Sequence, residues 1–199
     1  MRLTEEEEVS PWYACPVILG NPQESGVDLA VALLNTWDTY DDPSEHLVDE
    51  ADLRLFLELV GRPRAARVAG AADLTAIKAV RDRLRRVFET ADEDEAASVL
   101  NAVAASAGAL PRLQRAGGDW VVRYGPDETE VAEHLAATAA GSLLEVVRAH
   151  GLSRFGTCAA APCTGVFVDR TKNRRKRYCC ELCADRAAQR DHRARRTKA

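Results

Sequence analysis

The sequence predicts a mainly α-helical domain with one small β-hairpin, an α+β fold, followed by a compact C-terminal module. Three observations lead to this prediction. Apolar residues recur with helical spacing over most of residues 27–152, two short β-rich runs flank a glycine turn, and five of the six cysteines lie between Cys158 and Cys183. We therefore expect an irregular acidic N-terminal arm (1–26), a helical domain (27–152) and a C-terminal module (153–199).

Amphipathic patterns define the elements of the domain. Helical character begins at Val27, and a hairpin is predicted from residues 111–114 and 120–124 around a Gly-Gly-Asp turn. The last predicted helix stops at Gly151, directly before the C-terminal module, so we expect the module to be held against the domain. Apolar residues at helical spacing predict the longer helices over residues 50–60, 73–88, 93–107 and 128–150.

Two polar sets in the domain each have two interpretations. Asn35, Trp37 and Asp38 either line a ligand pocket or, as we expect, cap and pack a helix end. The basic residues of the 73–88 helix either bind nucleic acid or form a solvated face, and we expect the solvated face. These basic residues are Lys78, Arg81, Arg83, Arg85 and Arg86.

Charge is divided unevenly along the chain. Residues 1–157 hold 15 Lys and Arg against 27 Asp and Glu, whereas residues 158–199 hold 12 against 4, a net charge of +8. Opposite charges on two segments suggest two roles, and the basic segment is the one that a polyanion would attract.

The cysteine spacing predicts a metal site. Cys158-x4-Cys163 is separated by fifteen residues from a second pair, which is either Cys179-x3-Cys183 or Cys180-x2-Cys183. Two close cysteine pairs enclose one tetrahedral Zn²⁺, and four thiolates leave no open position, so we expect one structural Zn²⁺ per chain. His192 is a weaker alternative ligand, and Cys15 is expected to be an ordinary thiol.

The residues around the cysteines predict the shape of this module. A strand at 166–168, a turn at 171–173, a return strand at 176–178 and a helix over 184–196 describe a treble-clef-like zinc finger. So small a module cannot hold together by apolar burial alone, so we expect the metal to supply its folding energy. The helical domain buries its own apolar stripes, and we expect it to fold without zinc.

At these residues the chain resembles the CGNR zinc finger family of bacterial proteins. Cys183-Ala184-Asp185-Arg186 stands where that family has Cys-Gly-Asn-Arg. The resemblance implies that the residue after Tyr178 opens the second pair, which makes Cys179 the ligand. The upstream region is similar to the ABATE domain at residues 29–38, and that domain is described as a stress-induced transcription regulator. Further matches to the zinc finger family lie in Cys158-x4-Cys163, Val166-Phe167-Val168-Asp169, Thr171-Lys172-Asn173-Arg174 and Arg177-Tyr178-Cys179.

These features predict a DNA-binding transcription regulator, with the helical domain as a sensor or dimerisation domain and a homodimer as one expected assembly. The alternatives are a protein-interaction module and an RNA-binding module, although the aromatic residues typical of single-strand recognition are missing. Any small-molecule effector is unknown. The expected contacts to double-stranded DNA are Lys172, Arg174, Arg175, Lys176, Arg177, Arg186, Arg190 and Arg193.

Other functional classes have no support in the sequence. No P-loop, GxGxxG, HExxH or GxSxG motif occurs, so we do not expect an enzyme. No apolar run reaches the eighteen residues of a membrane span, and Glu5–Glu8 stand where a signal peptide would begin. We therefore expect a cytoplasmic protein with no membrane partner.

Overall fold

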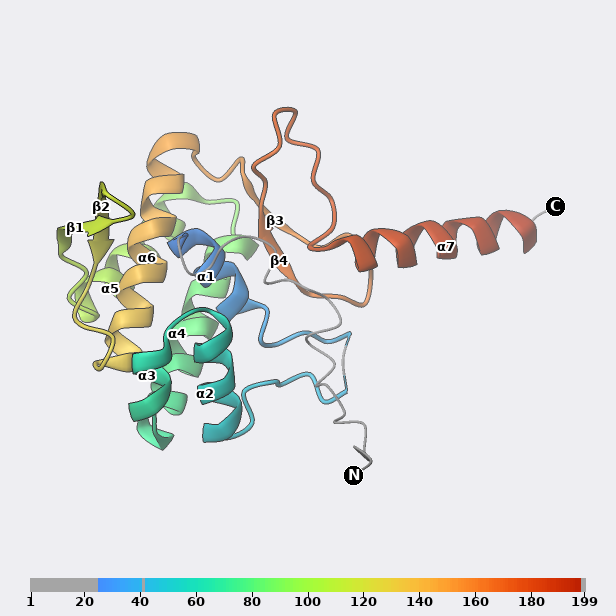
Figure 1. Cartoon of the computed structure of the whole chain (residues 1–199). Coiled ribbons are helices and arrows are strands. Elements are labelled where there is room, and N and C mark those ends of the chain that lie inside the picture. The colour runs from blue at the N-terminus through green and yellow to red at the C-terminus, as the bar shows by residue number, and fades with distance from the viewer. Residues whose placement is uncertain (1–24, 41, 198–199) are drawn as a thin grey trace, which may run out of the picture.

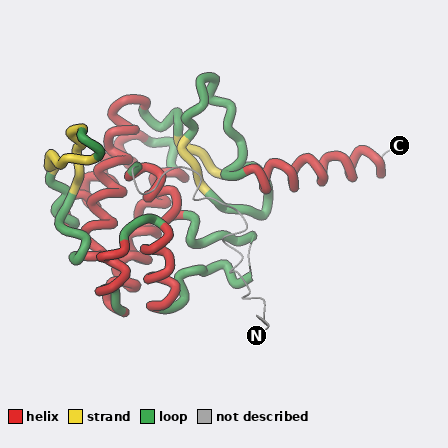
Figure 2. The backbone as a smooth tube through the Cα atoms, in the orientation of Figure 1, coloured by secondary structure: helices red, strands yellow, loops and turns green. Residues whose placement is uncertain are grey.

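The computed structural model describes residues 25–40 and 42–197, so the predicted arm lies almost wholly outside the described residues, as does Cys15. The helices pack into one body, with a β-hairpin on one side and the last helix extending away from it (Figures 1 and 2). The helices are α1 (Gly26–Leu34), α2 (Glu50–Leu59), α3 (Pro63–Val68), α4 (Ala71–Glu89), α5 (Glu93–Ser106), α6 (Val131–His150) and α7 (Glu181–Thr197). The strands are β1 (Pro111–Ala116), β2 (Asp119–Tyr124), β3 (Phe155–Thr157) and β4 (Val166–Val168).

Polar side chains fix where several of the helices begin. Asp49 accepts hydrogen bonds from the first turn of α2, and the carboxylate of Asp52 reaches back to the Asp49 amide to complete a capping box. Ser25 and Asp92 are the N-caps of α1 and α5, and their side chains accept hydrogen bonds from first-turn amides. Helix α3 was not predicted: Pro63 ends the pattern of α2, but it also occupies the first turn of a new helix, where its missing N–H costs nothing.

The hydrophobic core lies between α6 and the helices α1, α4 and α5, all of which contact it. Leu33, Leu84, Leu100 and Leu143 of these helices are completely buried there, and so is Phe56 of α2. Each such side chain contributes about 1.5–3 kcal/mol through the hydrophobic effect. The mainly helical prediction for this part of the chain is confirmed.

The β1–β2 hairpin lies against α6 through two glycines. A Cβ atom at Gly141 of α6 would lie 2.4 Å from the ring of Tyr124, the last residue of β2. Gly125 has a φ of +85°, and a Cβ atom there would lie 2.3 Å from the Ala137 side chain. Because neither site has space for a side chain, the end of β2 and the loop after it sit close to the surface of α6.

The second hairpin differs from the prediction. Strand β4 pairs antiparallel with β3, so that Phe155 lies opposite Val168 and Thr157 opposite Val166. The predicted return strand at 176–178 is wrong, because those residues form no strand. At Val166, the Asn35 side chain takes the place of a strand: Asn35 Nδ2 donates to the Val166 carbonyl at 3.0 Å and Val166 N donates to Asn35 Oδ1 at 2.7 Å.

These two strands join the C-terminal module to the main core. Val166 is completely buried in the cluster formed by the helices, and Phe155 and Val168 pack against that cluster. The Phe155 ring meets the Phe88 ring of α4 edge-on, with centroids 5.0 Å apart. The module is therefore held against the domain, as expected. The expectation that the helical domain buries its own stripes without the module needs correction, because β3 and β4 complete its core.

A buried guanidinium strengthens this junction. Arg85 of α4 is 9% exposed, and its nitrogens donate to the carbonyls of Leu34 at 2.7 Å, Trp37 at 3.0 Å and Thr164 at 2.9 Å. Burial lowers the pKa of Arg85, but a guanidinium stays charged at physiological pH. It therefore links the end of α1, the loop that follows and the chain next to Cys163. This burial, shared by Arg81 at 3% exposure, contradicts the expected solvated face for these two residues, whereas Arg83 and Arg86 are exposed as expected.

Replacing the buried arginine tests this link. Arg85→Met keeps the length and removes the donors, which leaves three carbonyls without their partner, two of them in helical-domain backbone. We expect the free energy of unfolding in urea to fall by about 3 kcal/mol. Arg83→Met, at an exposed position of the same helix, is the control and should change it by less than about 0.5 kcal/mol. Equal effects of the two substitutions would contradict the anchoring role.

Candidate metal centre

Four cysteines from two places in the chain meet at one point. Cys158 follows β3 and Cys163 precedes β4, so the tip of this hairpin carries the first pair. Cys179 lies just before α7, and Cys183 lies in its first turn. The four sulfur atoms all lie within 4.8 Å of one another, which forms one group of potential metal ligands.

The spacing of the sulfurs fits tetrahedral zinc. The Cys179 Sγ atom lies 3.7 Å from both Cys163 Sγ and Cys183 Sγ. A Zn–S bond of about 2.3 Å at tetrahedral angles places neighbouring sulfurs about 3.8 Å apart. The donor set is four thiols with no carboxylate or water position, as in a closed structural zinc site. The chain therefore has one site suited to a single Zn²⁺.

The surroundings of the sulfurs favour bound thiolates. Gly165 N and Cys179 N point at Cys163 Sγ and Cys158 Sγ, at 3.3 and 3.5 Å, and the N-terminal end of α7 adds a favourable dipole. Hydrogen bonds from the Cys163 and Cys179 thiols lower the pKa of Cys158, whereas the hydrogen bond to Cys158 raises the pKa of Cys163. Thiolates this close repel one another, and a divalent cation between them removes that repulsion.

The other candidate ligands lie outside the group. Cys179 belongs to it and Cys180 does not, although both are buried. His192 is exposed on α7, more than two turns beyond Cys183. Within the described residues the geometry thus agrees with Cys179, the residue that the family resemblance indicated.

The loop after α1 supports the first cysteine pair. Asp38 Oδ1 accepts from Thr164 N, the amide next to Cys163, at 2.9 Å. Thr39 Oγ1 donates to the Pro162 carbonyl at 2.6 Å. Asn35, which we expected to cap a helix end, does occupy the C-cap of α1, but its side chain binds Val166. The polar residues at 35–39 therefore hold the zinc-binding hairpin in place, a role that neither interpretation of the sequence included.

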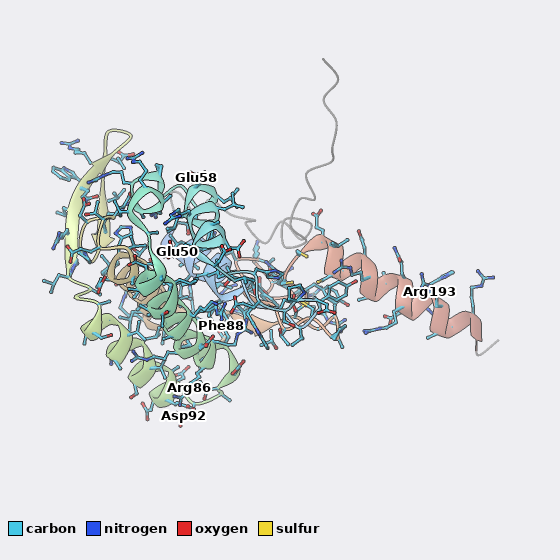
Figure 3. All side chains as sticks on the ribbon, turned by 90° about the horizontal axis from the view of Figure 1, so that it is seen from below. Glu50, Glu58, Arg86, Phe88, Asp92 and Arg193 are labelled. Atoms are coloured by element: carbon cyan, nitrogen blue, oxygen red, sulfur yellow. The ribbon has the colours of Figure 1, made fainter. Side chains whose placement is uncertain are left out.

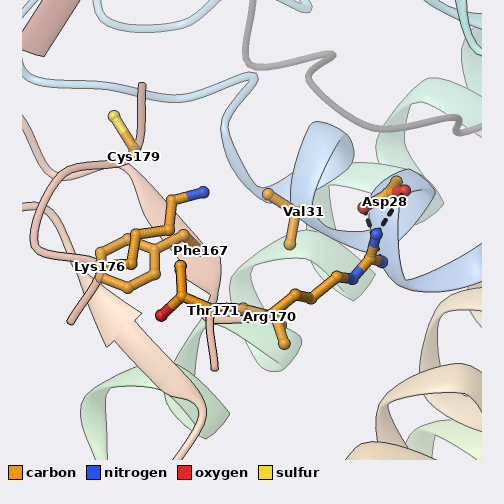
Figure 4. Close-up of a pocket in the computed structure, with 8 residues that line it drawn as sticks. Asp28, Val31, Phe167, Arg170, Thr171, Lys176 and Cys179 are labelled. Carbon is orange, nitrogen blue, oxygen red and sulfur yellow. Dashed lines mark hydrogen bonds and ion pairs between the residues drawn. The ribbon is translucent and has the colours of Figure 1, made fainter. Parts of the chain in front are cut away.

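An ion pair closes the same junction from the other side. Arg170, just after β4, donates to Asp28 of α1, with a nitrogen–oxygen distance of 2.8 Å. Figure 4 shows this pair beside a cavity of about 310 Å³ between α1 and the finger, with Lys176 lying over the Phe167 ring. Arg170 and Lys176 are therefore both engaged within the protein, Arg170 with Asp28 and Lys176 with the Phe167 ring.

The predicted DNA contacts around residues 172–177 are mostly on the surface. Lys172, Arg174, Arg175 and Arg177 are exposed, whereas Lys176 is half-buried. Asp169 organises this loop, since its carboxylate accepts from Thr171 N at 2.7 Å and from Lys176 N at 2.9 Å. The loop is therefore a fixed turn with a row of cations on its outside.

The predicted contacts on α7 fall into two groups. Arg186 lies over the Tyr40 ring at 3.7 Å, and Arg190 donates to the Ala161 carbonyl at 3.1 Å, so both contact their own chain. Ala187 is the last buried residue of α7. Beyond it the helix projects from the body, and Arg193 lies on this projecting part (Figure 3).

Metal analysis of cysteine variants tests the site. We expect one zinc per purified chain, and Cys158→Ser, Cys163→Ser and Cys183→Ser should each lose it, because three thiolates no longer complete the tetrahedron. Cys179→Ser should lose zinc as well, whereas Cys180→Ser, next to it in the chain, should retain it and serves as the matched control. Loss of zinc from Cys180→Ser with retention in Cys179→Ser would reverse the assignment. Zinc is measured by atomic emission on the folded protein.

Comparison with known proteins supplies the family. Residues 154–196 match the CGNR zinc finger model, and residues 27–150 match the ABATE model, described as "Putative stress-induced transcription regulator". Neither description names an enzymatic activity, and a search of the curated proteins finds no match. None of the helices in the described residues is long and apolar enough to cross a bilayer. With the four-cysteine group and the helical core both in place, the chain belongs to the ABATE family and carries a C-terminal CGNR zinc finger.

Proposed function

We propose that this protein is a transcription regulator that binds double-stranded DNA through its zinc finger, with the helical domain as a sensor or dimerisation domain. The family descriptions support a regulatory role. The observation that carries the DNA-binding part is the form of α7, a basic helix that leaves the body of the protein after Ala187 (Figure 1). Cations on a projecting helix are the arrangement by which many regulators reach DNA.

The dimensions of the projecting segment suit a major groove. From Ala187 to Thr197 the helix extends by roughly 15 Å at 1.5 Å per residue. The major groove is about 12 Å wide, close to the roughly 10–12 Å diameter of a helix with its side chains, so one helix fits into it. Arg193, Arg195 and Arg196 are exposed on this segment, and Arg195 Nε turns back to the Asp191 carbonyl at 3.3 Å.

The base of the helix has a different task. Arg186 and Arg190 are engaged with Tyr40 and Ala161, so they fix the angle at which α7 leaves the finger. A cation that is stacked on a tyrosine is partly withdrawn from solvent and contributes less to attracting phosphate. Because the segment beyond Ala187 projects from the body, we place the proposed DNA contacts of α7 on it, at Arg193, Arg195 and Arg196, and keep the exposed loop cations Lys172, Arg174, Arg175 and Arg177 for the phosphates.

Salt-dependent binding of the zinc-loaded full chain tests the proposal. The full chain is needed because β3 and β4 belong to the main core. Affinity for duplex DNA, measured by fluorescence anisotropy, should fall steeply with salt because phosphate contacts release counterions. Arg174→Ala with Arg175→Ala should reduce the slope of log affinity against log salt by about two units, roughly one for each contact.

Two further variants separate the parts of the finger. Arg196→Ala should weaken binding, whereas Arg67→Ala, at an exposed position of α3, is the control and should leave affinity and slope unchanged. If the zinc-loaded chain shows no affinity for any duplex at low salt, the DNA-binding proposal fails. Binding of single-stranded RNA in preference to duplex DNA would favour the RNA-binding alternative.

A further inference from the structure

A small polar cavity lies within the helical domain, away from the zinc site. It has a volume of about 220 Å³ and lies between α6, the end of the β1–β2 hairpin, the loop that follows it and the turn between α2 and α3. Its polar lining includes Arg62, Arg123, Glu128 and His134. The tight contact of Gly125 with Ala137 fixes the loop that carries Glu128 against the helix that carries His134. The cavity is therefore built from rigid elements.

Three buried atoms in this cavity lack a hydrogen-bond partner among the described residues. They are Arg62 Nε, Glu128 Oε2 and His134 Nε2. Arg62 is only 6% exposed, although its Nη1 donates to the carbonyls of Val60 and Gly61, both at 3.2 Å. Buried polar groups in proteins are almost always paired, since an unpaired one costs about 1–3 kcal/mol. All three atoms belong to residues that line this one cavity, and a polar guest there would give them partners.

The hydrogen-bonding character of each atom defines what would satisfy it. Arg62 Nε carries a hydrogen and needs an acceptor, preferably an anion. Glu128 Oε2 needs a donor, preferably a cation. The Nδ1 atom of His134 lies 3.0 Å from the Pro126 carbonyl, which can only accept, so Nδ1 carries the hydrogen. Burial lowers the pKa of His134, which favours the neutral ring, and its Nε2 is then a second acceptor that needs a donor.

The charged residues of the lining also indicate a ligand that carries both an anionic and a cationic group. Arg62 and Arg123 supply positive charge to one cavity and Glu128 supplies negative charge. An inorganic phosphate would be attracted by the arginines but repelled by Glu128. A ligand with an anionic group and a cationic group would satisfy both. The volume is below the roughly 300–1,000 Å³ that is typical of pockets for drug-sized ligands, so the ligand is small.

We propose that this cavity binds a small amino-acid-like zwitterion, whose carboxylate meets Arg62 and Arg123 and whose ammonium group meets Glu128 and His134. The inference rests on the proposed function, since it gives the sensor role of the helical domain a ligand class. The site is separate from the cations of the finger, and its test contains no DNA. A failure to bind a ligand therefore leaves the DNA-binding proposal standing, and a failure to bind DNA leaves this one standing.

The first test screens defined probes. The zinc-loaded full chain is heated with each of the standard L-amino acids at millimolar concentration, and the melting temperature is compared with that of the free protein. At least one amino acid should raise it with increasing dose, because a ligand that binds only the folded state stabilises it. Inorganic phosphate is the control for charge alone. If no amino acid raises the melting temperature, or if phosphate raises it equally, the proposal is overturned.

The second test identifies the contacts by calorimetry. For the best amino acid, the analogue without the amine and the analogue without the carboxylate should each bind about tenfold more weakly or worse. Glu128→Gln should weaken the binding of the amino acid by a similar factor. It should leave the affinity for the amine-free analogue unchanged, because only the ammonium group contacts Glu128. Glu133→Gln, on an exposed carboxylate beside His134, is the matched control and should change neither. Equal weakening of the amino acid and its amine-free analogue by Glu128→Gln would overturn the assignment, and the analogue series decides it even if that variant does not fold.

Discussion

The arrangement of the helical domain and the zinc finger depends on the hydrogen bonds made by the guanidinium of Arg85. It stands at the junction of α1, α4 and the zinc-binding hairpin and satisfies one carbonyl from the hairpin and two from the helical domain. A carbonyl at a helix end or in a tight loop needs a donor when it is buried. Arg85 donates to three such carbonyls, and the planar geometry of its donors holds α1, the loop after it and the zinc-binding hairpin at fixed distances. The cation–π contact of Arg85 with Trp37, at 5.2 Å, adds to this rigidity.

This anchoring couples metal binding to the stability of the helical domain. Cys163 and Thr164 are adjacent, so the chain that carries a zinc ligand also carries the carbonyl that Arg85 binds and the amide that Asp38 accepts from. Val166, two residues further on, is completely buried in the main cluster. The free energy of zinc binding to four thiolates is therefore shared with the packing of α1 and α4. The finger is thus joined to α1 and α4 by direct contacts.

The sequence predicted the helices other than α3, and the cysteine group, because these follow from local patterns. Apolar spacing places a helix, and paired cysteines place a metal. The predicted return strand at 176–178 was wrong because the Asn35 amide binds the backbone of Val166 instead of a second strand. Asn35 lies 131 residues away in the chain, so no local pattern reveals this contact. The role of Arg85 had a signal: Arg81 and Arg85 fall on the same helix face as Ile77, Leu84 and Phe88, and a cation on an apolar stripe indicates a buried contact.

Arginines have two roles in this chain, and the burial of each side chain distinguishes them. Buried arginines stabilise the junction, and exposed ones are proposed to contact DNA. Arg81 and Arg85 are buried. Arg81 is paired with the Glu45 carboxylate, and Arg85 donates to the Thr164 carbonyl and stabilises the junction. Arg186 is half-buried and Arg190 is exposed, and their contacts with Tyr40 and Ala161 set the direction of α7. The arginines further along α7 and on the 172–177 loop are exposed, so their charges lie where a polyanion could reach them. The net charge of +8 in residues 158–199 therefore overstates the charge on offer to DNA, since Arg170, Lys176 and Arg186 are already used within the protein.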